Sequence, residues 1–206
     1  IRKDSLIYAL GATIARHCQE LGVHVNFAPV VDINSNPRNP IIGMRSFGED
    51  PEEVTQKAIL YAYGSLSQNV LHHTLPVIPH SRQRLDSVEL YPYQHLIEAG
   101  IPAVMVSHLA VKSIDSTGIP ASLSSPVIQG LLRRELNFSG LCFTDAMNMK
   151  GVTQNSQPGE AEVKALLAGN DMLLFPANLG KAVEAIKKAL ADSLLDERTI
   201  DEKCRK

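Results

Sequence analysis

The sequence predicts an α/β fold in which parallel strands are covered by helices. Three observations support this class: short apolar runs are typical of buried strands, segments with helical spacing alternate with them, and turn residues separate the two. With 206 residues, the chain is long enough for one well-cored domain or for part of a larger one. The clearest strand, Gly140 to Thr144, is followed directly by Asp145, at the tip where α/β folds place their chemistry.

The first third of the chain follows this alternation. Apolar residues at helical spacing predict a helix from Asp4 to Leu21, and Val23 to Val30 is predicted to be a strand. The loop from Asp32 to Gly48 is dense in Asn, Pro and Gly and is too long for a simple connector, so we expect it to have a binding role. A capped helix is predicted from Asp50 to about Ser67.

The remainder continues the pattern after one interruption. Between Gln68 and Pro79 there is too little sequence for a strand and a functional loop, so either two helices follow each other or a β-element is absent. The helices predicted beyond this interval are Leu85–Ala99, a helix that is capped by Ser124 or Ser125 and runs to about Leu136, Glu160–Ala168 and the tail from Leu179. The predicted strands are Ala103–His108, Gly140–Thr144 and Asp171–Phe175.

Composition narrows the choice of partners. A formal net charge of -2 with 44% hydrophobic and 20% charged residues argues against disorder, a nucleic-acid partner or attraction to a membrane surface. Cys18, Cys142 and Cys204 form neither a disulfide framework nor a metal knuckle, and the first two are predicted to be core residues. No apolar run approaches the roughly 18 residues of a membrane span. We therefore expect a small neutral or mildly polar substrate, with the compartment, cytoplasm or periplasm, left open.

Three ordered blocks carry a resemblance that covers essentially the whole chain. They are Asn26-Phe-Ala-Pro-Val-Val-Asp-Ile-Asn34, Ile42-Gly-Met-Arg-Ser-Phe-Gly-Glu-Asp-Pro51 and Phe143-Thr-Asp-Ala-Met-Asn-Met-Lys-Gly151. Together they resemble family 3 glycoside hydrolases, specifically the bacterial β-N-acetylhexosaminidase branch. The resemblance implies that residues 1–206 form a single, partial domain of the (β/α)8 TIM-barrel type. The family's first barrel strands have no counterpart in this sequence, and a further domain in the full-length protein is possible.

The resemblance also implies a reaction. It is that of a retaining exo-β-glycosidase, which removes terminal β-N-acetylglucosaminides of cell-wall or chitin-type sugars through a covalent glycosyl intermediate. Asp145 matches the family's nucleophile, and the chemistry needs a proton donor on the other side of the anomeric carbon. A carboxylate and an imidazole would supply this chemistry without a metal or an organic cofactor. The alternative for Asp145 is a cap on the following helix.

Three further residues match family positions around the sugar. Arg45 matches the arginine of Gly-x-Arg-Ser-Phe, whose guanidinium can hold oxygens in a fixed orientation; its alternative is a structural pair with Glu49 or Asp50. Asp32 either contacts the sugar or orders its loop. His108, at the end of a predicted strand, either faces the same pocket or is a core histidine with satisfied ring nitrogens.

The proton donor is where the sequence departs from the family. His72 aligns with the family's acid/base histidine, but the Lys-His-Phe-Pro-Gly-His-Gly block that precedes it is missing, and Val70 stands where the family has Asp. A valine cannot orient or stabilise an imidazolium. Two explanations are open: residues of a loop and its strand are absent from this sequence although the protein has them, which we favour, or the protein lacks them and is inactive.

Two other functions remain as alternatives. One is β-glucosidase or β-xylosidase activity of the same family, in which a Glu from another domain donates the proton; retention of the stretch around His72 argues against it. The other is a non-catalytic module that binds sugars through Arg45 without turnover.

Overall fold

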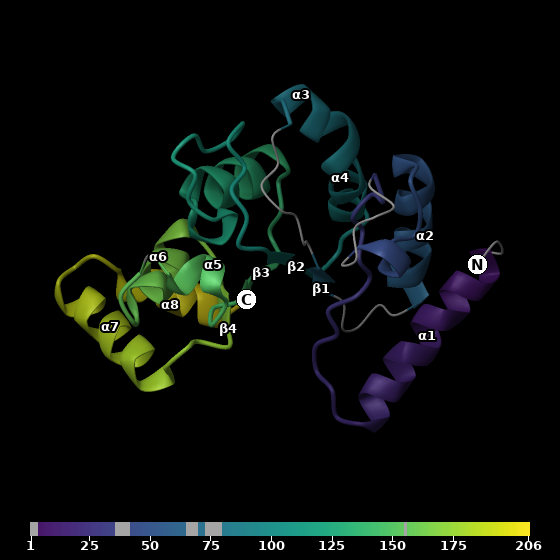
Figure 1. Cartoon of the computed structure of the whole chain (residues 1–206). Coiled ribbons are helices and arrows are strands. Elements are labelled where there is room, and N and C mark those ends of the chain that lie inside the picture. Colours follow the sequence, from purple (N-terminus) through teal and green to yellow (C-terminus); the bar gives the residue numbers. More distant parts are fainter. Residues whose placement is uncertain (1–3, 36–41, 65–69, 73–79, 155) are drawn as a thin grey trace. The chain divides into compact units, whose positions relative to one another are not determined.

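The computed structural model describes residues 4–35, 42–64, 70–72, 80–154 and 156–206, and for residues 64 and 70–72 it describes the backbone alone. The chain divides into two compact units: unit 1 comprises residues 1–74 and 80–105, and unit 2 comprises residues 75–79 and 106–206. In each unit helices alternate with short parallel strands (Figure 1). The predicted α/β class is confirmed.

Unit 1 contains the first helices and a parallel pair of strands. In chain order its elements are α1 (Asp4–Glu20), the 3₁₀ turn η1 (Gly43–Arg45), α2 (Pro51–Gly64), β1 (Val70–His72), α3 (Arg82–Arg84), the π-helical turn η2 (Leu85–Glu89), α4 (Tyr91–Glu98) and β2 (Ala103–Val106), whose last residue is assigned to unit 2. The helices expected at these places are confirmed. The Asp50 carboxylate caps α2 by accepting from the amide of Glu53 at 2.9 Å.

The helices of unit 1 pack closely. Helix α1 packs on α2, and α2 packs on α4. A side chain at Gly11 would place its Cβ 2.3 Å from the carbonyl oxygen of Tyr61, so only glycine allows α1 to approach α2 this closely. Ile7 of α1 and Val54 of α2 are buried in the same unit.

Two predictions in unit 1 are wrong. The segment Val23–Val30 forms only isolated bridges, at Asn26 and Val30, because apolar composition indicates a tendency to be buried but a strand also needs a continuous partner. Val23 and Val25 are 40% and 37% exposed. The interval after Gln68 does contain a β-element, because three residues opposite Ala103–Met105 suffice to form β1.

Unit 2 contains the second parallel pair. Its elements are the 3₁₀ turn η3 (Ala121–Leu123), the π-helix η4 (Pro126–Glu135), β3 (Leu141–Ala146), α5 (Lys150–Thr153), α6 (Glu160–Ala168), β4 (Met172–Leu174), α7 (Leu179–Ala191) and α8 (Glu197–Cys204). The predicted helices and strands are confirmed here, but η4 has the wider π geometry and β3 extends through Asp145. Ser124 Oγ accepts from the Val127 amide at 3.3 Å at the start of η4.

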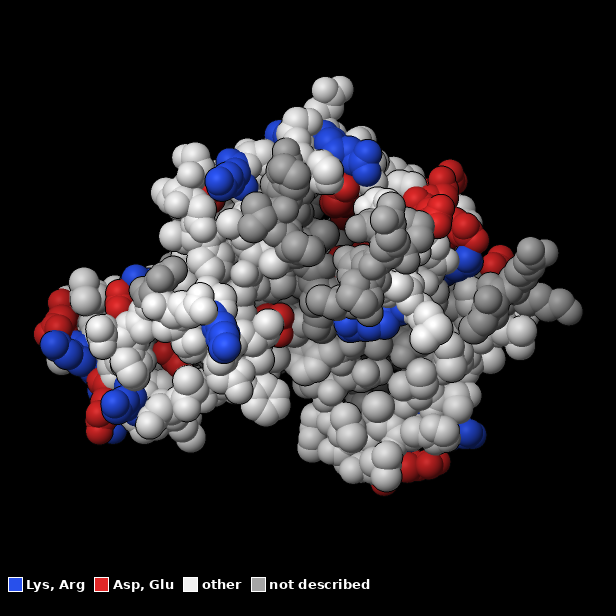
Figure 2. All heavy atoms as spheres, viewed as in Figure 1, with Lys and Arg blue, Asp and Glu red and all other residues white. Residues whose placement is uncertain are grey.

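Clusters of buried apolar side chains stabilise the described part of unit 2, and two of them involve α6. Met147, Val152, Ala161 and Ala165 form one, and Leu166, Ala189 and Leu195 form the other. Over the α7 region of the face shown in Figure 2, acidic and basic side chains are interspersed rather than gathered by sign. None of the helices in the described residues is both long and apolar enough to cross a membrane.

Candidate active site

Asp145 lies at the carboxyl end of β3, as the sequence predicts, and its side chain is half-buried. The pairing changes register here: Phe143 lies opposite Met172 and Ala146 opposite Leu174, so β3 advances three residues while β4 advances two. A bulge of this kind bends the strand and changes the direction of the side chains within it. Asp145 therefore lies in an irregular stretch at the end of the strands where α/β enzymes bind their ligands.

Thr144 makes the hydrogen bond that compensates for the irregular pairing. Its side chain is fully buried, and its Oγ1 accepts from the amide of Leu174 at 3.0 Å. Just beyond, the Met147 amide donates to the Leu174 carbonyl at 2.8 Å. Both backbone groups of Leu174 are therefore satisfied across the bulge, as buried peptide groups require.

His108 contacts the residue that follows Asp145. Its Nε2 lies 2.9 Å from the carbonyl oxygen of Ala146, which can only accept, so Nε2 carries a proton. Its Nδ1 lies 2.6 Å from Ser122 Oγ, which donates to the neutral ring. Burial lowers the pKa of His108, and the Ala146 carbonyl and the Asp145 charge oppose this effect only in part. Both ring nitrogens are thus satisfied within unit 2, which favours the core-histidine alternative.

The Asp145 carboxylate itself has few protein partners. Its Oδ1 accepts from the Ala146 amide at 2.7 Å, and in the described part of unit 2 no lysine or arginine pairs with it. Met147, two residues further along, lines a hollow together with Glu162 of α6 and Asn178 after β4, and Asp145 is not among the residues that line this hollow. A half-exposed carboxylate whose charge is not neutralised by a neighbouring cation is able to act as a nucleophile.

Asp32 and Arg45 both belong to the long loop of unit 1. Asp32 is buried, and its carbonyl oxygen accepts from Ser46 Oγ at 2.7 Å, so this residue is tied to the far side of the loop. Arg45 is exposed, and among the described residues its guanidinium pairs with neither Glu49 nor Asp50. The structural pair considered for Arg45, with Glu49 or Asp50, is therefore not formed.

His72 is the last residue of β1. Its backbone lies opposite Met105 of β2, and Val70 and Leu71 occupy the two preceding positions of the same ladder. The His72 side chain and residues 73–79 lie outside what the structure describes.

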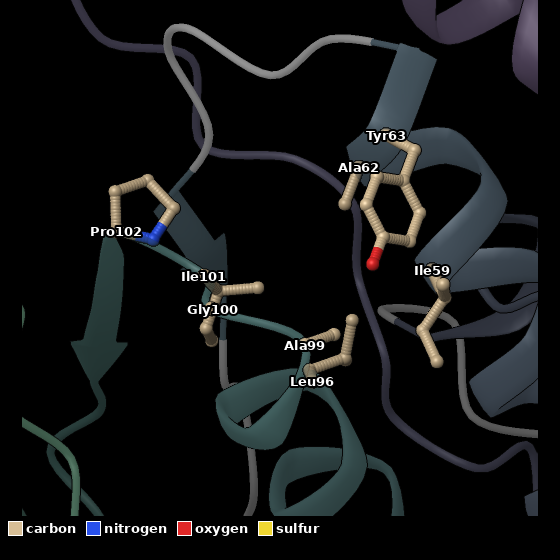
Figure 3. Close-up of a pocket in the computed structure, with 8 residues that line it drawn as sticks. All are labelled: Ile59, Ala62, Tyr63, Leu96, Ala99, Gly100, Ile101 and Pro102. Atoms are coloured by element: carbon tan, nitrogen blue, oxygen red, sulfur yellow. The ribbon is translucent and has the colours of Figure 1, made fainter.

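A hollow in unit 1 has a different character. It lies between the carboxyl ends of α2 and α4 and the start of β2 (Figure 3). Its lining is apolar apart from the Tyr63 hydroxyl: Ile59, Ala62, Tyr63, Leu96, Ala99, Gly100, Ile101 and Pro102. Because no carboxylate or imidazole is among these residues, this hollow is not the candidate site.

A second carboxylate, that of Asp171 directly before β4, contacts the amino end of β3. It is buried, and its Oδ2 accepts from the Cys142 amide at 2.9 Å and from Arg133 at 2.6 Å. Lys206, just beyond α8, donates to its Oδ1 at 3.0 Å. Burial raises the pKa of the Cys142 thiol to about 12, so the expectation of a core cysteine is confirmed here, whereas Cys18 is only half-buried.

Comparisons with known proteins identify the family of this chain. The family described as "Glycosyl hydrolase family 3 N terminal domain" matches residues 2–206. The chain is 32% identical to beta-hexosaminidase A of Pseudoalteromonas piscicida over 93% of its own length, and 27% identical to a beta-N-acetylglucosaminidase/beta-glucosidase of Cellulomonas fimi over 92%. The structure of a family 3 beta-N-acetylglucosaminidase from Paenibacillus sp. FPU-7 superposes with a TM-score of 0.93 at 33% identity over 98% of the chain.

The chain therefore belongs to glycosyl hydrolase family 3, and the predicted TIM-barrel class is confirmed for it as part of the N-terminal domain. It spans 38% of the length of each of the two curated relatives and 42% of the Paenibacillus chain. The alignment with the Pseudoalteromonas enzyme has 226 positions, 20 more than this chain has residues. That relative thus carries residues without a counterpart here.

Two residues near Asp145 are not among those predicted from the sequence. Thr144 is predicted only as part of an apolar strand, and Ser122 belongs to no predicted site. A hydroxyl within a buried strand, directly before an acidic residue, is a signal that could have singled out Thr144, because such a group needs a partner. Nothing in the sequence indicates the contact between Ser122 and His108, which are 14 residues apart.

Proposed function

We propose that the full-length protein is a retaining exo-β-glycosidase that hydrolyses terminal β-N-acetylglucosaminides of cell-wall or chitin-type sugars. The observation that carries this proposal is the half-exposed Asp145 carboxylate at the carboxyl end of β3, with no cation paired to it in the described part of unit 2. The names of two relatives, a beta-hexosaminidase and a beta-N-acetylglucosaminidase, support N-acetylglucosamine as the sugar. In this proposal, residues 1–206 belong to a single, partial barrel domain.

In the first step, an Asp145 oxygen attacks the anomeric carbon and the bond to the leaving oxygen breaks. In this proposal His72 donates a proton to that oxygen, so the leaving group departs as a neutral alcohol. In the second step, His72 removes a proton from water, and the resulting oxygen attacks the anomeric carbon and releases Asp145. Two inversions at the same carbon give net retention of configuration.

Arg45 has the role of substrate clamp in this mechanism, and Asp32 that of a residue that contacts the sugar or orders the loop around it. A guanidinium offers several N–H donors in one plane, which suits hydroxyl and acyl oxygens. The exposure of Arg45 and the absence of a pair with Glu49 or Asp50 support this role. The buried position of Asp32 and its tie to Ser46 favour loop ordering for Asp32.

The direct test compares the full-length protein with its Asp145→Ala variant on 4-nitrophenyl N-acetylglucosaminide. Removal of a nucleophile is expected to lower kcat by roughly 10⁴-fold or more. Equal turnover by both proteins would reject Asp145 as the nucleophile. A His72→Ala variant that remains active would in turn reject His72 as the acid/base.

The second candidate is β-glucosidase or β-xylosidase activity. The dual name of the Cellulomonas fimi relative favours keeping it. Rates on the 4-nitrophenyl glucoside, xyloside and N-acetylglucosaminide separate the two activities, and preference for the glucoside or xyloside would replace the first candidate. A protein that binds N-acetylglucosamine but hydrolyses none of the three would be the non-catalytic module.

A further inference from the structure

Two hydrogen bonds fix the residues next to Asp145 in the chain. Before it, buried Thr144 Oγ1 accepts from the Leu174 amide at 3.0 Å, where the register between β3 and β4 changes. After it, the Ala146 carbonyl accepts from His108 Nε2 at 2.9 Å. The residues immediately before and after Asp145 are therefore each fixed by a neutral side chain.

Neither side chain is arranged to meet a sugar. Thr144 is fully buried. The second ring nitrogen of His108 is occupied by Ser122 Oγ at 2.6 Å, so the imidazole has no free polar atom for a ligand. The contacts instead fix the backbone on either side of a bulge, and a bulge decides where the side chain within it is directed.

We infer that Thr144 and His108 are positioning residues for the Asp145 carboxylate, and that Ser122 orients His108 in this task. The inference rests on the proposed function for the consequence in catalysis, but its structural part stands on the described contacts alone. Thr144 keeps the irregular register by replacing a backbone acceptor with its hydroxyl. His108 then fixes the Ala146 peptide, whose amide in turn donates to the Asp145 carboxylate at 2.7 Å.

The groups that fix the backbone next to Asp145, the Thr144 hydroxyl and the His108 imidazole, are both neutral, and there is a chemical reason for this. A cation next to Asp145 would neutralise the charge that the attack requires and compete with the sugar for its oxygens. A hydroxyl and a neutral imidazole restrict the backbone without pairing with the carboxylate. Because attack requires the oxygen to lie in line with the anomeric carbon, a displacement of about 1 Å is enough to slow it by about 100-fold.

The test uses paired variants of the full-length protein. Thr144→Val removes the hydroxyl at nearly constant volume, whereas Thr144→Ser keeps it. His108→Asn keeps the reach of Nδ1 but loses the donor to Ala146, whereas His108→Gln places an amide nitrogen near the position of Nε2. Thr55→Val is the matched control, because Thr55 is also a buried threonine but lies in α2 of unit 1.

Thr144→Val and His108→Asn are expected to lower kcat by about 10- to 100-fold, with KM changed less than about 3-fold. Thr144→Ser, His108→Gln and Thr55→Val are expected to stay close to the wild-type kcat. Crystal structures of Thr144→Val and His108→Asn should show the Asp145 carboxylate displaced from its wild-type position, while thermal unfolding identifies any variant that fails to fold. A raised KM at wild-type kcat for His108→Asn would instead mean that His108 contacts the sugar, and would overturn the inference.

Failure of the inference can be told from failure of the proposed function. If the wild type hydrolyses the substrate and Asp145→Ala does not, wild-type kcat for Thr144→Val and His108→Asn overturns the inference and leaves the function intact. If the wild type hydrolyses none of the glycosides, the proposed function fails and the crystal structures decide alone. An Asp145 carboxylate that keeps its place in both variants then overturns the inference, and a displaced one supports it.

Discussion

Two carboxylates lie near opposite ends of β3 in different environments: Asp171, directly before β4, contacts its amino end, and Asp145 lies at its carboxyl end. At the amino end, the Asp171 carboxylate is buried and is contacted by Arg133, Lys206 and the Cys142 amide. At the carboxyl end, Asp145 is half-buried, and its carboxylate accepts a hydrogen bond from the adjacent Ala146 amide. One carboxylate is compensated by cations and the other keeps its charge available. In barrels, the amino end of the strands serves stability and the carboxyl end serves chemistry.

The sharpest way to break this comparison is to neutralise each carboxylate in turn. Asp171→Asn leaves Arg133 and Lys206 without their anion in a largely buried place, and we expect it to cost about 3–5 kcal/mol of unfolding free energy. Asp145→Asn retains an acceptor for the adjacent amide and should change that free energy by no more than about 0.5 kcal/mol. Urea unfolding of the full-length variants measures both values. Similar losses in the two would remove the distinction between the ends.

The lysines around Asp171 sharpen the comparison further. Lys203 donates to the Asn170 carbonyl at 2.7 Å and its side chain is 10% exposed, whereas the Lys206 side chain is 35% exposed. Lys203→Met leaves a buried carbonyl without its donor and is expected to cost about 1–3 kcal/mol. Lys206→Met removes a partly exposed pair worth at most about 1 kcal/mol. Urea unfolding of both variants measures whether Lys203→Met loses more unfolding free energy than Lys206→Met. An equal or larger loss for Lys206→Met would contradict this expectation.

The smallest expected effect is the dependence of stability on pH through His108, which contacts the carboxyl end of β3. Burial lowers the pKa of His108 below its ordinary value of 6.5 in the folded state, with the Asp145 charge opposing this in part. The unfolded chain therefore binds a proton before the folded one does. Stability contributed by neutral His108 is complete above pH 6.5 and is lost as the pH falls through the lowered value.

His108→Gln lacks this titration, so its stability should fall less steeply than that of the wild type between pH 7.5 and pH 5. Urea unfolding at several pH values, followed by one spectroscopic signal, measures the difference in slope. Parallel slopes for the two proteins would mean that the folded environment of His108 does not disfavour its charge.

Much of the fold was accessible from the sequence, for reasons that particular elements make clear. Helices such as α1 and α6 have apolar residues at helical spacing and terminal glycines, which are local features. The segment Val23–Val30 has an equally apolar pattern but no continuous ladder, because pairing depends on residues distant in the chain. For the same reason, the three residues of β1 were not expected to form a strand.

The candidate site divides in the same way. Asp145 could be singled out because an apolar run ending in a carboxylate is a local pattern. The bulge at Thr144 and the contacts of His108 could not be found, because they depend on register between strands and on a loop packed beside them.

By itself, the sequence determined the α/β class, the helices with their caps, and the carboxylate at the tip of a buried strand, since each follows from spacing along the chain. Only the tertiary structure decided that Asp171 would be neutralised by cations while Asp145 would not, and that neutral groups would hold the backbone around Asp145. These outcomes depend on which side chains meet across elements up to 38 residues apart, such as His108 and Ala146. Packing settles such meetings, and local residue preferences do not encode them.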